Sequence, residues 1–306
     1  MAVMSTQNLQ YSWARDLDEL LMDEYTRQPE EFTSAFKMGN SNDHFVKKAL
    51  MATLGAATEI TQGGATPHSA FVEGPSKTVY FTKYGMGLQA TEEAWDDQRQ
   101  PVLRDVTAEL GKSLAYCRDL KAWDVYNSGF VTTARTGIDG KALFASDHPL
   151  YGATGVTASN LVTGTLSKTT LKTALDKSEN LVNEQNIPIV SRGPYVVLVA
   201  PANRWIAEEI IKSEYDPETA NNAVNPINTL YGKSLTYKVI HYFTSTTQWF
   251  VYDMGMKQYG PEFIWRQKMR RKFEQDYNTD NRLWKATMRF IATFWYWRNV
   301  VGSSGT

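Results

Sequence analysis

The chain has 306 residues, of which 42% are hydrophobic and 21% charged, and these proportions exclude a disordered chain. No uncharged apolar run reaches the ~18 residues of a membrane-spanning helix, and the amino terminus lacks the basic and apolar blocks of a secretion signal. The net charge is −1, and Cys117 is the only cysteine, which excludes an internal disulfide and fits a reducing compartment.

The first ninety residues predict extended, weakly packed segments. Residues 9–50 indicate an arm with two helical pieces, "LDELLMDEY" and "DHFVKKALMATL", separated by a polar stretch. Residues 55–90 are rich in glycine and β-forming residues, and "KTVYFTKYG" alternates as a strand does. We interpret 55–90 as a long two-stranded loop, and a loop with so little core of its own is usually functional or mobile.

A long helix is predicted next. Apolar side chains recur at steps of three or four, the spacing of one helix face, at Leu103, Val106, Leu110, Leu114, Cys117 and Leu120. Gly129 follows Asn and Ser in a typical helix stop. If Pro101 marks the first turn, the helix has about 27 residues and a length of ~40 Å, which suits a spine better than a bundle.

Residues 166–254 alternate helices and strands. Ser167 caps a predicted helix, "YVVLVAP" predicts a short buried strand, and "ANRWIAEEIIKS" predicts a second helix. "LTYKVIHYF" and "QWFVYDMG" predict two further strands. We therefore expect one sheet with helices around it in this region.

Residues 257–301 predict two long antiparallel strands around the turn "NTDN". They end in an aromatic run from Phe294 to Trp297. If this run is a strand, it presents rings on both faces, and each face needs cover from its own subunit or from another copy.

The charge is distributed unevenly along the chain. Residues 255–306 hold ten Lys and Arg against four Asp and Glu, a balance of +6, whereas residues 1–128 hold twelve against eighteen, a balance of −6. Such a basic tail attracts either nucleic acid or an acidic neighbour, and an ordinary solvated face is the plain alternative.

No motif in the chain indicates catalysis strongly. His148 lies in "SDHP", but adjacent Ser, Asp and His side chains on an extended segment point apart, so a hydrolase using His148 is the weaker alternative. The four histidines lack metal-ligand spacing, and "QGGATPH" lacks the ending of a phosphate loop. We expect no enzyme activity, no metal and no cofactor.

The order of arm, long loop, spine helix, α/β region and terminal strand pair resembles the major capsid proteins of tailed bacteriophages. The resemblance implies the α+β Hong Kong 97-type fold. Five stretches are most similar to the Mu-like major head subunit family, namely "FKMGNSNDHF", "YGMGLQATEEAWDDQ", "GKALFASDHP", "PYVVLVAPANRWIAEEII" and "WYWRNVVGSSG".

The resemblance also implies a role for each segment. The implied segments are an N-terminal arm (1–54), an extended loop (55–90), a peripheral domain with the spine helix (91–159), an axial domain (160–254) and peripheral long strands with a returning C-terminal strand (255–306). The arm would reach over a neighbouring subunit, and the loop would lie on one.

The implied function is a shell subunit that assembles in the host bacterial cytoplasm into pentamers and hexamers of an icosahedral virion capsid around double-stranded DNA. The implied partners are other copies, a separate scaffold protein, a portal protein and a decoration protein, with no membrane. The candidate contacts with other subunits or with DNA phosphates are Lys77, Lys83, Asp96, Asp97, Arg266, Lys268, Arg270, Arg271, Lys272, Trp295, Trp297 and Arg298. An encapsulin-like nanocompartment is the alternative that keeps the fold.

Overall fold

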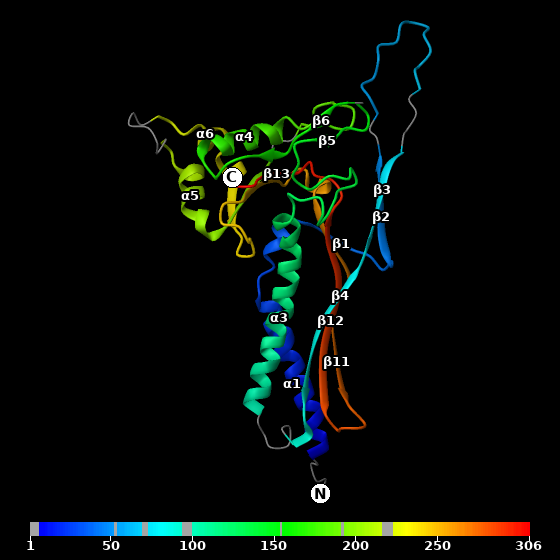
Figure 1. The fold of residues 1–306 in the computed structure, drawn as a ribbon, viewed down its shortest axis with the longest axis vertical. Helices are drawn as coiled ribbons and strands as arrows, with labels where there is room; N and C mark the ends of the chain where they lie inside the picture. The colour runs from blue at the N-terminus through cyan, green and yellow to red at the C-terminus, as the bar shows by residue number, and fades with distance from the viewer. Residues whose placement is uncertain are drawn as a thin grey trace.

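The computed structural model describes residues 6–51, 54–68, 73–93, 100–153, 155–190, 193–215 and 223–306. Two helices lie along a long sheet, a second sheet with three helices closes one end, and a hairpin projects from the body beside it (Figure 1). The Asp96 and Asp97 predictions lie outside these residues.

The long sheet has four strands in the order β1-β11-β12-β4. The strands are β1 (Lys37–Asn40), β4 (Thr82–Ala90), β11 (Pro261–Gln275) and β12 (Arg282–Phe294). Side chains of β12 alternate between a buried face and an open face: Trp284, Ala286 and Met288 are buried, whereas Lys285 is exposed. The predicted long antiparallel strand pair is confirmed by β11 and β12.

The buried face of this sheet packs against α3 (Gln100–Asn127) and α1 (Thr6–Arg27) (Figure 1). The 28-residue α3 confirms the predicted spine. Leu110 and Leu114 are buried as the periodicity predicts, although Val106 stays 41% exposed. At Gly111 a Cβ atom would lie 2.7 Å from a backbone carbonyl of α1, so glycine permits the close approach of the two helices.

The second sheet has five strands in the order β7-β13-β10-β8-β9. They are β7 (Leu161–Val162), β8 (Tyr195–Val199), β9 (Leu235–Val239), β10 (Trp249–Asp253) and β13 (Val300–Ser303). Every residue of β8 and β10 is buried. One face of the sheet adjoins the end of α3, and the other is covered by α4 (Lys168–Glu179) and α5 (Arg204–Lys212).

The helices of this region follow the predicted pattern. Ser167 caps α4 through a reciprocal pair of hydrogen bonds with Thr170, as the sequence indicated. The short helix α6 (Pro226–Tyr231) begins where Asn225 accepts a hydrogen bond from the backbone of Ile227, in a stretch for which the sequence predicted neither helix nor strand.

The projecting hairpin consists of β2 (Phe45–Met51) and β3 (Glu73–Tyr80). The predicted helix at "DHFVKKALMATL" is therefore wrong, because this segment pairs with β3 and packs as a strand. The hairpin begins before residue 55, and β4 leaves it to join the long sheet. One further small sheet pairs two strands of two residues each, β5 (His148–Pro149) and β6 (Thr157–Ala158).

Candidate assembly interface

The tip of the hairpin does not pack against the core of its own chain. All residues from 54 to 68 are exposed, and the tip stands clear of the body (Figure 1). An ordered segment of this kind buries too little surface to offset its conformational entropy alone.

The base of the hairpin is attached to the body by the aromatic run. Lys48 and Lys77, directly opposite each other on β2 and β3, both lie over the Trp295 ring, at 5.2 and 5.6 Å. Trp295 packs with Leu50 and Ile138 in a small cluster of its own. Cation–π contacts of this kind contribute about 0.5–2 kcal/mol each.

Glu262 of β11 completes this attachment. Its carboxylate accepts from the Lys48 ammonium at 2.6 Å and from the Trp295 indole N–H at 3.0 Å, and Lys37 lies 3.4 Å away. The Glu262 side chain is only 6% exposed, so the two lysines are needed to neutralise a buried charge.

Trp295 and Trp297, two of the candidates for contact with another copy, are 1% and 3% exposed within their own chain. Their own subunit therefore covers both rings, which is one of the two alternatives that the sequence left open. Beyond Phe294 the run is not a strand, because β12 ends at that residue and the chain turns to reach β13. Arg298 is also buried. Its guanidinium pairs with Glu184 at 2.7 Å and donates to the Val182 carbonyl.

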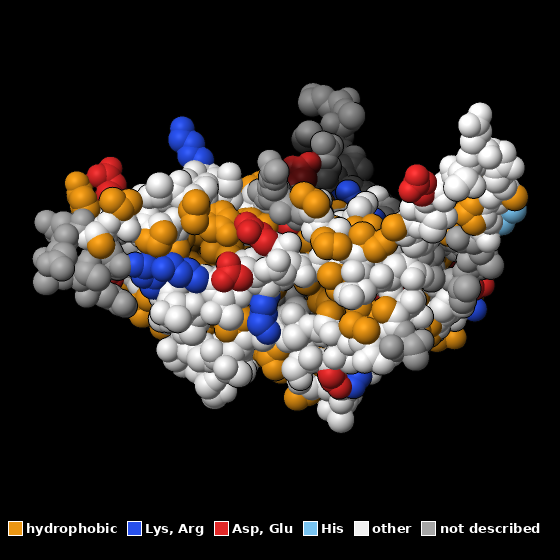
Figure 2. Space-filling view, turned by 90° about the horizontal axis from the view of Figure 1, so that it is seen from above, with side chains coloured by type: hydrophobic (Ala, Val, Ile, Leu, Met, Phe, Trp, Pro, Cys, Tyr) orange, Lys and Arg blue, Asp and Glu red, His pale blue; other side chains and the backbone are white. Residues whose placement is uncertain are grey.

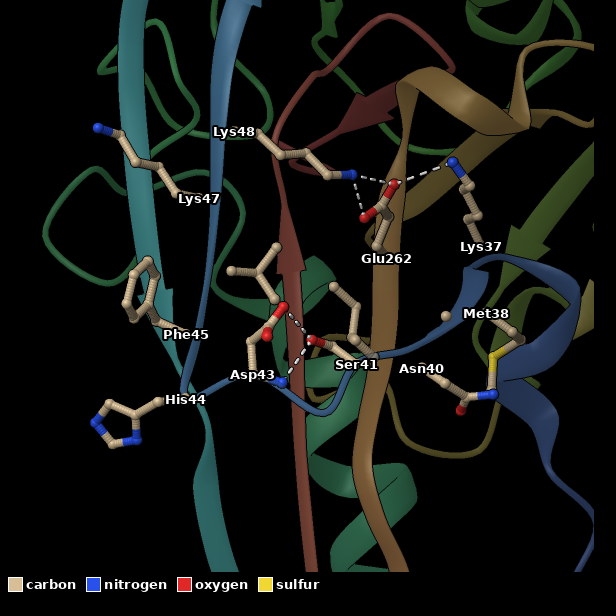
Figure 3. Close-up of a pocket in the computed structure, with 13 residues that line it drawn as sticks. Lys37, Met38, Asn40, Ser41, Asp43, His44, Phe45, Lys47, Lys48 and Glu262 are labelled. Carbon is tan, nitrogen blue, oxygen red and sulfur yellow. Dashed lines mark hydrogen bonds and ion pairs between the residues drawn. The ribbon is translucent and has the colours of Figure 1, made fainter.

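A groove of about 660 Å³ lies between β2 and the β1–β11 edge of the long sheet (Figure 3). Figure 3 shows Lys48 and Lys37 reaching Glu262 from opposite sides, whereas Lys47, Phe45 and His44 lie on the far side of β2. Phe45 is 45% exposed and Met38 is 38% exposed, so the groove and its rim combine apolar and basic side chains.

The open face of the long sheet is basic. Cross-strand register places five cations on the side opposite the helices, Lys83, Arg270, Lys272, Lys285 and Arg289. Lys272 lies directly opposite Lys285, and Lys83 directly opposite Arg289, arrangements that are destabilising without a counter-charge. Among the described residues none of the five has an acidic partner. We call this set the basic sheet face.

The remaining basic candidates lie elsewhere. Arg271 points to the helix side, where its guanidinium donates to the Asp18 carbonyl at 2.6 Å. Lys268 lines a pocket beside α1, and Arg266 sits at an irregularity in the β11–β12 pairing. Only Arg270 and Lys272 of the predicted β11 cluster therefore share the basic sheet face, and sequence spacing alone missed Lys285 and Arg289.

Exposed apolar side chains gather at the end of the molecule formed by the five-stranded sheet. Trp205 is 74% exposed, Leu230 78% and Val190 81%, and Figure 2 shows apolar groups reaching the surface across this end. Leu230 and Val190 line one shallow pocket between α4 and α6. Large exposed apolar groups of this kind mark contact surfaces.

His148 has no access to a substrate. Its side chain is 0% exposed, its two ring nitrogens contact Asp139 at 2.6 Å and Asn160 at 3.1 Å, and Trp297 stacks on the ring at 4.2 Å. These contacts give His148 a structural role in the fold, so the hydrolase alternative has no support. Among the described residues no group of three His, Cys, Asp or Glu side chains could hold a metal.

None of the described helices has the length and apolar character that crossing a bilayer requires. A long sheet backed by a spine helix, a second sheet at one end and a projecting hairpin define a protein of the Hong Kong 97-type capsid fold. A family model described as phage capsid protein matches residues 74–303, and the chain belongs to this family. It is a structural subunit of a virion capsid shell and not an enzyme.

Solved structures carry the same fold at low identity. The virus-like particle from Pyrococcus furiosus is 7% identical, with 95% of this chain and 98% of that chain covered and a TM-score of 0.56. The capsid of cyanophage P-SCSP1u is 10% identical, with 88% and 85% covered and a TM-score of 0.55. The mature capsid of bacteriophage PhiM1 is 10% identical, with 90% and 87% covered and a TM-score of 0.54. No curated protein sequence matches the chain.

Proposed function

We propose that this subunit is the major capsid protein of a tailed phage, and that it forms the pentamers and hexamers of an icosahedral shell around double-stranded DNA. The family match over residues 74–303 carries the proposal. Electron microscopy of the expressed chain should show closed shells with five-fold and six-fold clusters. A subunit that stays monomeric under all assembly conditions, with or without a scaffold protein, contradicts it.

Each segment has a proposed role. The described part of residues 1–54 begins with α1, which packs on α3 of its own chain. The hairpin, rather than this helix, would therefore extend toward a neighbouring subunit. Residues 55–90 would rest on an adjacent subunit, 91–159 and 255–306 would form the peripheral body, and 160–254 would meet its copies around the capsomer centre.

The apolar end supports the last role. Trp205 and Leu230 are large, exposed and located on α5 and α6 of the 160–254 region. Leu230→Asp should abolish capsomer formation, while Leu230→Met should preserve it, because only the first change adds a charge to an apolar contact. Native mass spectrometry of the two variants distinguishes pentamers and hexamers from monomers.

The basic sheet face has two proposed occupants, acidic side chains of a neighbouring subunit or phosphates of packaged DNA. Its cations lack acidic partners among the described residues, which supports an anionic partner of either kind. If DNA is the partner, Lys272→Gln lowers the salt-dependent affinity of subunits for a DNA duplex. If a neighbour is the partner, the same variant weakens assembly and leaves DNA affinity unchanged.

The resemblance to the major capsid proteins of tailed phages supports a separate scaffold protein, a portal protein, a decoration protein and assembly in the host cytoplasm. The alternative that keeps the fold, a protein-filled, encapsulin-like compartment, is not favoured, because the family match is to phage capsid proteins. Nuclease-resistant DNA inside particles isolated from the phage host decides for the capsid. Particles that hold protein and no DNA decide for the compartment.

A further inference from the structure

A separate cavity lies where the hairpin joins the body. It has a volume of about 380 Å³ and opens between β3, β4, the C-terminal part of α3, the loop at 134–136 and the end of β12. It shares no lining residue with the groove of Figure 3. Its walls carry three cations, Lys77, Lys121 and Arg135, and none of the described residues on the lining carries a carboxylate.

Arg135 offers an unused donor. One terminal nitrogen, Nη2, pairs with Asp124 at 2.9 Å, but the other, Nη1, is buried and has no hydrogen-bond partner among the residues that the structure describes. A buried donor of a charged group that lacks a partner costs about 1–3 kcal/mol or more. Lys121, one wall away, has no ion pair within the described part of the chain.

Lys77 adds to the positive charge of the cavity. Its ammonium donates to the carbonyls of Thr136 and Phe294 and to the hydroxyl of Thr293, at 2.5, 3.2 and 3.3 Å. Those three acceptors use all its donors, so it contributes charge without binding a ligand directly. Burial and the neighbouring Arg135 charge lower the pKa of Lys77 to about 8, although Asp139 opposes the shift.

We propose that this cavity binds an oxyanion, held by the guanidinium of Arg135, whose side chain is 27% exposed, and by the ammonium of Lys121. Charge-assisted hydrogen bonds from a guanidinium fit both phosphate and carboxylate, which share this chemistry. Thr78, Thr82 and Thr136 also line the cavity. Because β3 and α3 both contribute walls, the bound anion joins the base of the hairpin to the spine helix.

Inorganic phosphate tests the site on the full-length unassembled subunit. Titration calorimetry at constant ionic strength should give saturable binding that Arg135→Gln and Lys121→Gln each weaken at least tenfold. Lys121→Gln leaves the Arg135–Asp124 pair intact, so it tests the site even if the first variant misfolds. Arg270→Gln, on the basic sheet face, is the matched control and should bind as the natural chain does. Absence of saturable binding, or equal weakening by all three variants, overturns the proposal.

The same titration on assembled shells identifies the source of the anion. If the site takes free phosphate, shells bind it as subunits do. If a carboxylate of a second copy occupies the site, shells no longer bind phosphate there, and Lys121→Gln slows assembly. Phosphate binding to shells that is insensitive to Lys121→Gln contradicts both forms of the proposal.

Discussion

The five-stranded sheet and the hairpin are opposite solutions to the same stability problem. Every residue of β8 is buried between helices and the end of α3, whereas every residue from 54 to 68 is exposed. The first region stabilises itself, because its apolar side chains fill a continuous core. The second relies on a small cluster around Trp295 at its base, so changes there should act locally and leave the core intact.

The largest expected effect comes from the self-sufficient region. Phe250 is 0% exposed and its ring lies 5.0 to 5.2 Å from those of Phe144, Phe243 and Tyr126. Phe250→Ala should lower the free energy of unfolding by about 3–5 kcal/mol, because it leaves a cavity. Urea denaturation followed by tryptophan fluorescence measures this loss of unfolding free energy. Tyr277→Ala, at a side chain 96% exposed, should change it by less than about 0.5 kcal/mol.

Loss of the buried charge at the hairpin base should be smaller and local. Glu262→Gln leaves Lys48 without its partner and should reduce the opening free energy of β2 by about 1–3 kcal/mol. Hydrogen exchange at fixed pH should show faster exchange in β2 and β3 with β8 unchanged. Glu274→Gln, at the exposed far end of β11, is the control. Equal acceleration in β8 would show that the two regions are not independent.

The pH dependence of Lys77 sharpens the contrast further. Its folded pKa of about 8 lies below the ordinary value of 10.5 because burial disfavours the ammonium. Between those values the unfolded chain binds more protons, so stability should rise as the pH goes from about 8 to 10. Lys77→Met should remove about 1–3 kcal/mol of that rise. Paired urea titrations at pH 7.5 and 10 measure the difference, and an unchanged rise in the variant contradicts it.

The smallest effect is expected on the basic sheet face. Lys272→Glu replaces a repulsive pair with Lys285 by an attractive one and should stabilise the isolated subunit by about 0.2–1 kcal/mol. Shell yield, measured by sedimentation, should fall if the face binds an acidic neighbour. A variant that is less stable as a subunit would show that the lysine pair is already neutralised.

Local patterns in the sequence predicted the five-stranded region and the spine helix well. The heptad-like spacing through Leu110 and Leu114, the Ser167 cap and the apolar run of β8 each encode their element within a few residues. The long strands of β11 and β12 were predictable for the same reason, since alternation and a polar turn are local signals.

The hairpin base was not predictable in this way. Helical spacing in 43–54 competed with a strand that forms only because β3 pairs with it and Trp295 packs under it. The aromatic run was interpreted as a strand because its neighbours in space were unknown, and burial by its own chain decided otherwise. The basic sheet face depends on register between strands far apart in sequence, which no spacing rule supplies.

Five residues link the two sheets, since the chain passes from the end of β12 at Phe294 to the start of β13 at Val300. Trp295 within that link also supports the hairpin. A change in the angle between the long body and the five-stranded end therefore moves the hairpin with it. We therefore expect the local curvature of a shell and the direction in which each subunit reaches its neighbour to be coupled through the base of the hairpin, where Trp295, Glu262 and Lys77 meet.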